Sequence, residues 1–451
     1  MGVGHRSGQS SLLLVNPWIH DFAAFDLWMR PLGFLELAAA VRSAGHAVDY
    51  IDLLQVTADE AARCGLKPSR VRPNGTASFV NAIIPKPGVY AGVSRRYRRY
   101  GLPPAALEER LKALARPDVI LVTSGMTYWY PGVAATITAL TAAFPHVPIA
   151  LGGTYATLCP DHAGQTAGAD AVLPGPWPAL LPGWLAGRGI ALPPGADAEP
   201  FAANDLYPGS RVAAMRLTAG CPFACDYCAS SRLARPFRSR GTERAVDEIA
   251  WNAAAGRTEI ALYDDALLFR AEETLTPVLD GVLRRGLNCR FHTPNGLHAR
   301  YVTPGLARLM RRAGFATVRV SFEGVAGRGR EMSDGKADPG HLEGALAALH
   351  GAGYRPGTIE VYTLVGLPGQ TEGDIMDTAG FIHRLGGVIR AAEYAPVPGT
   401  RLFEADVARD PRIAVEPLLH NDTVAPGWDF DTARLERVKQ AIKALNRAST
   451  E

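Results

Sequence analysis

Short apolar runs alternate with amphipathic stretches through the first part of the chain. The apolar runs lie at residues 11–15, 48–53, 119–123, 149–151 and 171–173. Stretches with helical periodicity follow at about 32–44, 132–144 and 177–185. Strands that alternate with helices in this way predict a parallel sheet with right-handed crossovers. We therefore expect an open α/β sheet over residues 1–190, interrupted at about 54–116 by an insertion longer than a plain βαβ unit requires.

A second series of strands and helices occupies the next part of the chain. Strands are predicted at 213–217, 259–263, 289–292, 317–322, 358–365 and 391–395. Helices are predicted between them at 243–254, 274–285, 304–313 and 339–352. This alternation favours a partial TIM-like barrel over residues 211–403, with its chemistry at the carboxyl ends of the strands.

Two further segments complete the predicted organisation. Residues 191–210 are rich in proline, alanine and acidic side chains, which is typical of a linker. Residues 404–451 form a short helical C-terminal segment, whose amphipathic helix at 431–448 carries basic residues near its end, as the helix dipole favours.

Composition narrows the class of protein only slightly. The chain has 451 residues, of which 47% are apolar, so it is long enough for two or three domains with ample cores. The net charge of +3 is too weak to indicate nucleic-acid binding. No run of about 18 apolar residues is present to span a membrane, and residues 1–10 lack an apolar signal core. We expect a cytoplasmic protein that binds neither membranes nor nucleic acids.

Three cysteines in one short loop carry the strongest chemical signal. Cys221, Cys225 and Cys228 have the spacing C-x3-C-x2-C, and the loop follows a predicted strand. Three thiolates can hold three irons of a 4Fe–4S cluster and leave the fourth iron open to a substrate. The alternatives are a structural zinc knuckle or buried thiols, although zinc normally needs a fourth cysteine or histidine nearby, and the loop has none. The scattered Cys64, Cys159 and Cys289 are expected to be buried free thiols.

With Tyr227 before the last cysteine, this loop resembles that of the radical S-adenosylmethionine (SAM) enzymes. The resemblance implies that SAM chelates the open iron through its amino and carboxylate groups. It also implies that the reduced cluster cleaves SAM to a 5′-deoxyadenosyl radical. A small-molecule substrate and an electron donor such as flavodoxin or ferredoxin are the partners expected on this basis.

Polar residues stand where the second and third barrel strands end. The resemblance places Asp264 and Asp265 where the SAM amino group is received, and a carboxylate could accept from that ammonium. Asp265 would equally suit a helix N-cap. Asn295 could reach SAM or the substrate, or could simply form an Asn-Gly turn.

The later strand ends add further candidates for SAM binding. Ser321 and Glu323 lie on one face of their strand by alternation, and the resemblance implies that they hold the ribose and amino acid of SAM. Gly366 could let backbone amides approach the adenine, or could serve a turn. Pro398 belongs to a Pro-Gly-Thr turn common in the cobalamin subgroup of the superfamily.

The first part of the chain resembles the cobalamin-binding domain of that subgroup. The matching stretches are PDVILVTSGMTYWYPG at 117–132, VPIALGGTYAT at 147–157 and GADAVLPG at 168–175. The resemblance implies that strand-end residues contact the cofactor, namely Ser124, Met126, Thr127, Gly152, Gly153 and Thr154. The Asp-x-His-x-x-Gly signature, whose histidine ligates cobalt in cobalamin mutases, is absent. A domain that kept the fold and lost the cofactor remains an alternative, and the glycine pair would also suit a plain strand-to-helix turn.

A basic and aromatic run lies in the insertion, at residues 95–100 (RRYRRY). It could clamp an anionic substrate through arginine forks and ring stacking. We favour the simpler interpretation, a solvated helix face with the tyrosines packed beneath it.

These observations favour a radical SAM enzyme that methylates or rearranges an unactivated carbon, with cobalamin as a further cofactor. The main alternative is an iron–sulfur binding or redox-sensing protein that keeps the fold without turnover. The series of polar and glycine residues at successive strand ends favours catalysis. A nucleic-acid-modifying enzyme is a third class, against which the weak charge argues. The resemblance does not select the substrate.

Overall fold

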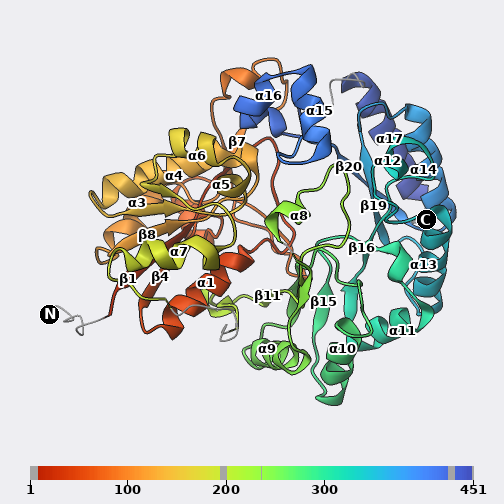
Figure 1. The fold of residues 1–451 in the computed structure, drawn as a ribbon, viewed down its shortest axis with the longest axis horizontal. Coiled ribbons are helices and arrows are strands. Elements are labelled where there is room, and N and C mark those ends of the chain that lie inside the picture. The colour runs from red at the N-terminus through yellow and green to blue at the C-terminus, as the bar shows by residue number, and fades with distance from the viewer. Residues whose placement is uncertain (1–8, 193–200, 235, 425–431, 449–451) are drawn as a thin grey trace. The chain divides into compact units, whose positions relative to one another are not determined.

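The computed structural model describes residues 9–192, 201–234, 236–424 and 432–448. Its contacts divide the chain into two compact units (Figure 1). Unit 1 runs to Pro208 and includes Arg412–Leu419, and unit 2 comprises Gly209–Pro411 and the chain from His420 onward. Each unit has its own core and is described separately.

Unit 1 is built on a five-stranded parallel sheet in the order β10-β9-β8-β1-β4. Its strands are β1 (Ser11–Asn16), β4 (Ala47–Asp52), β8 (Val119–Val122), β9 (Ile149–Leu151) and β10 (Ala171–Val172). Parallel strands covered on both faces are continuously apolar, and β1 and β8 accordingly bury nearly every residue. This confirms the open parallel α/β sheet that the sequence predicts.

Helices cover both faces of this sheet (Figure 1). One core contains Leu13 and Val15 of β1 with residues of α3 (Pro104–Lys112), α4 (Tyr130–Ala143), α5 (Thr154–Leu158) and α6 (Pro160–Thr166). The opposite core contains Leu12 and Leu14 with residues of α1 (Leu32–Ser43) and α7 (Trp177–Ala186). Alternation along β1 therefore supplies both cores.

The insertion forms small antiparallel sheets together with two short strands that follow β1. One has the order β2-β7-β6, from β2 (Ile19–Asp21), β6 (Asn81–Ile83) and β7 (Arg98–Tyr100). The other pairs β3 (Phe25–Asp26) with β5 (Ala77–Ser78). The predicted helix over the run 95–100 is wrong, because residues 98–100 are strand β7. Tyr97 and Tyr100 are nevertheless buried, as that interpretation expected.

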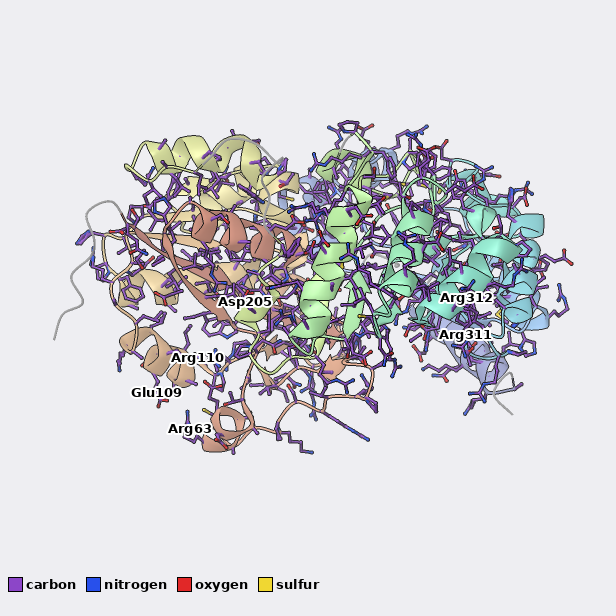
Figure 2. All side chains as sticks on the ribbon, turned by 90° about the horizontal axis from the view of Figure 1, so that it is seen from below. Arg63, Glu109, Arg110, Asp205, Arg311 and Arg312 are labelled. Carbon is purple, nitrogen blue, oxygen red and sulfur yellow. The ribbon has the colours of Figure 1, made fainter. Side chains whose placement is uncertain are left out.

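A charged pair ties this insertion together. Arg110 of α3 donates from Nε and Nη2 to the two carboxylate oxygens of Glu60, at 2.8 and 2.7 Å. Glu60 belongs to α2 (Ala58–Arg63), whose Arg63 also lies near Glu109 of α3 (Figure 2). Two forked hydrogen bonds hold α2 against α3 more firmly than one point contact would.

Unit 2 contains two four-stranded parallel sheets whose strands alternate with helices (Figure 1). The first sheet has the order β11 (Val212–Met215), β14 (Glu259–Leu262), β15 (Arg290–His292), β17 (Phe315–Thr317). The second has the order β16 (Leu297–His298), β18 (Arg319–Ser321), β19 (Glu360–Val365), β20 (Val388–Glu393). The predicted strand at 317–322 is split by Val318 between β17 and β18. In the described part of the chain the strands therefore form a parallel core without a closed barrel.

Six of the helices of unit 2 pack their apolar faces onto these strands in one large core. They are α9 (Thr242–Ala254), α10 (Leu275–Arg284), α11 (Pro304–Ala313), α13 (Pro339–Gly351), α14 (Glu372–Arg384) and α17 (Thr432–Ala448). No helix among the described residues is both long enough and apolar enough to cross a membrane.

The predicted linker lies partly outside the described residues. Its second half packs on unit 1, where the Ala203 N–H donates to the Leu35 carbonyl at 3.1 Å. The Tyr207 hydroxyl donates to Asp52 at 2.6 Å. This half is therefore an ordered part of unit 1.

Candidate functional site

The three cysteines lie in one loop after β11 and the short strand β12 (Thr218–Ala219), beyond the carboxyl end of β11. All three thiols are free. Cys221 and Cys225 are half-buried, and Cys228 is exposed. Within the described ranges, no three His, Cys, Asp or Glu side chains gather closely enough for a single metal ion. A cluster does not require such convergence, because each thiolate binds its own iron.

Burial raises the pKa of the Cys225 thiol to about 12, against the opposing effect of the Lys336 ammonium. Burial also raises the pKa of Cys221, again partly offset by Lys336 among other groups. Both thiols are consequently protonated near neutral pH in the metal-free chain. Coordination to iron would deprotonate them, because a bound metal stabilises the thiolate.

The segment from Met332 to Asp334 holds one side of the cysteine loop. The Asp226 N–H donates to the Met332 carbonyl at 3.0 Å, and the Cys225 thiol donates to the Ser333 carbonyl at 3.3 Å. The Ala224 N–H donates to the Asp334 carboxylate at 2.8 Å. These three bonds bridge about a hundred residues of sequence and fix the loop backbone.

Helix α15 (Arg401–Arg409) holds the other side of the loop. The Leu402 N–H donates to the Asp226 carbonyl at 3.1 Å, and Arg401 forms an ion pair with the Asp226 carboxylate at 2.9 Å. The start of the helix is fixed by the Thr400 side chain, which accepts from the Phe403 N–H. Farther along the helix, Asp406 accepts from the Tyr394 hydroxyl. The cysteine loop is therefore held by the 332–334 segment on one side and by α15 on the other.

Asp264 organises the chain that enters the loop. Its buried carboxylate accepts from the N–H groups of Leu217 and Thr218 and from the Thr218 hydroxyl. Burial nevertheless raises the pKa of Asp264 to about 6. Three donors of the protein thus bind this carboxylate, which fixes the chain just before the cysteine loop.

Asp265 and Asn295 lie at the same group of strand ends. Asp265 accepts from the Ser230 hydroxyl at 3.3 Å, and that hydroxyl lies 3.3 Å from the Cys228 sulfur. The Asn295 amide donates to the carbonyls of Tyr263 and Asp264 at 3.2 and 3.1 Å. Asp265 is therefore the carboxylate of the predicted pair that lies nearer the cysteines.

Glu323 is almost buried and has two partners. One carboxylate oxygen accepts from the Leu364 N–H at 3.1 Å, and the other lies 3.7 Å from the Lys336 ammonium. The Ser321 hydroxyl instead donates to the Leu297 carbonyl at 3.3 Å. Glu323 lies two residues beyond the end of β18, and of these two side chains it is the one that faces the Lys336 ammonium.

Two predicted glycine-rich turns close the later strand ends. Gly366 has a left-handed backbone, with φ of 82°, and its N–H donates to the side chain of Gln370 at 2.9 Å. Nothing in the sequence indicated that Gln370 would bind this backbone, beyond its position in a turn. Pro398 precedes Gly399, whose carbonyl accepts from the Arg232 guanidinium at 3.2 Å. This second turn connects β20 to α15 and so to the cysteine loop.

The strand ends of unit 1 bring the other predicted residues together. The Ser124 hydroxyl donates to the Gly152 carbonyl at 2.6 Å. Gly153 has φ of 91°, and a Cβ there would lie 2.4 Å from the Ser124 carbonyl oxygen. At Gly152 the nearest atom to such a Cβ is the Leu173 carbonyl oxygen, at 3.8 Å. Gly153 therefore permits close backbone packing, whereas a Cβ at Gly152 would meet only ordinary van der Waals contact.

The remaining residues of this group flank the glycines. Met126 is 41% exposed and precedes the 3-10 turn η2 (Thr127–Trp129), in which Thr127 is buried. Thr154 is the first residue of α5 and is half-buried. A partly exposed rim of backbone and side chains thus lies at the carboxyl ends of β8 and β9, where ligands of parallel sheets bind.

Residues 215–382 match the model of the radical SAM superfamily. The chain carries a radical SAM domain. The full chain resembles the structure of a cobalamin-dependent S-adenosylmethionine radical enzyme, OxsB, solved with aqua-cobalamin and S-adenosylmethionine bound. That likeness has a TM-score of 0.58 and 11% identity, and covers 97% of this chain and 61% of that one. At this identity the likeness shows the shared fold.

Two curated relatives cover smaller parts of the chain. A ribosomal protein uS12 methylthiotransferase, RimO, of Saccharopolyspora erythraea is 30% identical over 189 residues, 39% of this chain and 37% of the relative. An uncharacterized methyltransferase of Pyrococcus horikoshii is 24% identical over 231 residues, 48% of each chain. The chain thus spans less than half of either relative.

Two buried polar atoms that lack a hydrogen-bond partner show whether this radical SAM domain can accommodate a 4Fe–4S cluster and SAM. The Tyr227 hydroxyl and the Nδ1 atom of His298 are both buried and lack a hydrogen-bond partner. The His298 ring packs edge-on against Phe223 of the cysteine loop, with ring centroids 4.9 Å apart. Burial, with Lys336 and Arg300, lowers the pKa of His298 to about 3, so its ring is neutral. Buried polar atoms usually have a hydrogen-bond partner, so unpartnered ones beside three free thiols are expected where a polar ligand binds. The residues of this site therefore fit a 4Fe–4S cluster and SAM.

Sequence reasoning missed Lys336 and His298. His298 lies three residues after the Asn295 that was singled out, on strand β16, and Lys336 follows an Asp-Gly turn. Neither residue belongs to a motif. Only the fold brings them to the cysteine loop.

Proposed function

We propose that this chain is a radical SAM enzyme in which Cys221, Cys225 and Cys228 hold a 4Fe–4S cluster that cleaves SAM reductively. The observation that carries the proposal is the arrangement of the cysteine loop. Its three thiols are free, its backbone is held on two sides, and unpartnered polar atoms lie beside it. When bound, the cluster and SAM supply a 5′-deoxyadenosyl radical, which can attack an unactivated carbon.

The residues around the loop have distinct roles in this proposal. Glu323 accepts from the ammonium group of SAM, and Asp265 and Asn295 line the neighbouring strand ends. Asp264 positions the loop, because its carboxylate is already occupied by Leu217 and Thr218. Electrons come from a donor such as flavodoxin or ferredoxin.

We further propose that unit 1 binds cobalamin and that the reaction is methylation or rearrangement of an unactivated carbon in a small molecule. The shared fold with a cobalamin-dependent radical enzyme supports the cofactor. The partly exposed rim at Met126, Gly152 and Thr154 supports its location. The similarity to an uncharacterized methyltransferase favours methyl transfer.

Product analysis separates these reactions. Anaerobically reconstituted protein would be incubated with SAM, a reductant, hydroxocobalamin and candidate substrates. A methyltransferase that uses cobalamin forms S-adenosylhomocysteine and 5′-deoxyadenosine together, whereas a rearrangement forms only 5′-deoxyadenosine or regenerates SAM. Turnover without any S-adenosylhomocysteine would exclude methyl transfer, and failure to retain hydroxocobalamin on gel filtration would exclude the cofactor.

A further inference from the structure

His20 of β2 and Arg99 of β7 lie directly opposite each other in the small antiparallel sheet of unit 1. Side chains of residues paired in this way extend from the same face of a sheet, with their Cβ atoms about 5 Å apart. Asp21, the next residue of β2, points to the other face, where it accepts from the Trp129 indole at 2.8 Å. The carboxylate that follows His20 is therefore directed away from Arg99.

Both side chains of this pair contain a buried nitrogen without a partner. In the part of the chain that the structure describes, neither Nε2 of His20 nor Nε of Arg99 has a hydrogen-bond partner. Both side chains are otherwise half-buried, so the rest of each remains in contact with solvent. A buried donor without an acceptor is costly, and folded proteins rarely keep one without a reason. Two such nitrogens on facing residues indicate a polar group of a ligand that both can bind.

Two aromatic rings border the pair. The Arg99 guanidinium lies over the Trp18 ring, with its Cζ atom 5.6 Å from the ring centroid. The His20 ring meets the Tyr97 ring edge-on, with centroids 6.5 Å apart. The Trp18 indole N–H donates to the Leu102 carbonyl at 2.7 Å, and the Tyr97 hydroxyl donates to the His20 carbonyl at 3.0 Å. The polar atoms of both rings are thus already bonded, so the unpartnered nitrogens belong to His20 and Arg99 alone.

The charges of the pair favour an anion. Burial lowers the pKa of Arg99, but an arginine stays protonated in proteins. Burial, with the charge of Arg99, lowers the pKa of His20 to about 4, so its ring is neutral. A neutral imidazole can bind a metal ion, but the adjacent guanidinium would repel one. An oxyanion instead accepts from the Arg99 Nε–H and, in the tautomer with its proton on Nε2, from His20.

The pair also lies near the place where ligands bind to parallel sheets. Strand β2 begins at Ile19, shortly after β1 ends at Asn16, and Trp129 belongs to the turn that follows β8. In the large sheet of unit 1, β4 and β8 lie on either side of β1, so the chain changes direction between β1 and β8. Open α/β sheets bind ligands beyond the strand ends at such a switch point.

We propose that His20 and Arg99 form a binding site for an oxyanion, a carboxylate or phosphate group carried by a small molecule. The anion clamp considered for the run 95–100 is then made by one arginine of that run, which lies on a strand. Two molecules could carry the group: the proposed cobalamin, through the phosphate of its nucleotide tail, or a separate small molecule. The site lies in unit 1 and needs no iron–sulfur cluster, so the inference stands apart from the chemistry proposed for the cysteine loop.

The test is a binding titration of the full chain with three aromatic probes, followed by ligand-observed nuclear magnetic resonance. Benzoate and phenyl phosphate carry the two kinds of oxyanion, and benzamide has the shape of benzoate without its charge. Wild type should bind at least one of the two anions about tenfold more tightly than benzamide. Arg99→Met should lose this preference, and Arg99→Lys, which keeps the charge without Nε, should keep part of it. Equal affinity of wild type for all three probes would overturn the inference.

Arg98→Met is the matched control. It removes the same charge from the preceding residue of β7, whose guanidinium donates to the Asn81 side chain at 2.6 Å on the other face of the sheet. This variant should bind the anion as wild type does, and equal losses in both methionine variants would refute a specific site. Thermal unfolding separates binding from folding: Arg99→Met removes an unpartnered buried donor, so its melting temperature should not fall. A lower melting temperature than that of Arg98→Met would assign Arg99 a structural role and overturn the inference.

Competition identifies the molecule that carries the oxyanion. Displacement of the bound probe by hydroxocobalamin, but not by cobinamide, which lacks the phosphate, would assign the group to the cofactor. A bound probe that neither compound displaces would assign the group to a separate small molecule.

Discussion

The Ala224 N–H donates to the Asp334 carboxylate at 2.8 Å, which joins the cysteine loop to a left-handed turn 110 residues later in the chain. Asp334 and Gly335 both have positive φ angles, of 53° and 60°. Aspartate tolerates this conformation better than most residues, since its short side chain bonds locally. Asp334 therefore contributes both the turn and the bond that supports the loop.

The first prediction concerns this turn. Asp334→Ala should lose the hydrogen bond, worth about 1 kcal/mol, and strain the turn by about 1 kcal/mol more. Iron loading after anaerobic reconstitution should fall, whereas Asp334→Asn, which keeps an acceptor and tolerates the turn, should load close to the wild-type level. Equal loading of the alanine and wild-type proteins would show that the turn does not support the loop.

The second prediction concerns SAM. Glu323→Ala should weaken SAM binding to the reconstituted protein about tenfold, equivalent to about 1.4 kcal/mol, without removing iron. The matched control is Glu360→Ala, which removes a carboxylate from the first residue of β19, where it pairs with Arg319. Equilibrium binding of SAM measures both. If the two variants bind SAM equally well, Glu323 is not part of the SAM pocket.

The third prediction separates two adjacent glycines in unit 1. Gly153→Ala should destabilise unit 1, because its Cβ would overlap the Ser124 backbone. Gly152→Ala should fold normally, since its Cβ meets only ordinary van der Waals contact. If the glycine rim holds cobalamin, Gly152→Ala should retain less hydroxocobalamin on gel filtration while its thermal unfolding is unchanged. Full retention would place the cofactor elsewhere.

The fourth prediction is a pH dependence in the insertion. Hydrogen bonds from Arg110 and Thr57, which outweigh burial, lower the pKa of Glu60 from 4.5 to about 2. A lowered folded-state pKa contributes stability that is fully present above pH 4.5 and is lost as the pH falls toward 2. Arg110→Met should therefore reduce stability at pH 7, by an amount that shrinks below pH 4.5 because the hydrogen bonds of Thr57 to Glu60 remain and only the Arg110 part of the pKa shift is lost. Denaturant unfolding at several pH values measures this, and a pH-independent difference would contradict the ion-pair account.

The sequence predicted the elements whose apolar pattern is strong. The strand at 149–151 and the helix at 304–313 have their predicted bounds, because buried parallel strands and amphipathic helices leave clear periodicities. The insertion was mispredicted at 98–100, where Arg98, Arg99 and the buried Tyr100 form a short strand. Short strands in small antiparallel sheets carry too few residues for a period to be recognised.

The same distinction between local and non-local features applies to the candidate site. The cysteine spacing is local in sequence, so it was recognisable at once. Lys336 and His298 reach the loop only through the order of the strands, and no local pattern marks them. The role of Asp264 was also hidden, because a carboxylate that accepts from backbone N–H groups looks the same in sequence as one that binds a ligand.

The most direct test of the central proposal is the formation of 5′-deoxyadenosine from SAM by reduced, reconstituted protein. Wild type and Cys289→Ala should both bind about four irons and form this product, because Cys289 is a buried thiol that the cluster does not need. Cys225→Ala should form none. Wild-type protein that carries its cluster and binds SAM yet releases no 5′-deoxyadenosine on reduction would contradict the proposal that this chain is a radical SAM enzyme.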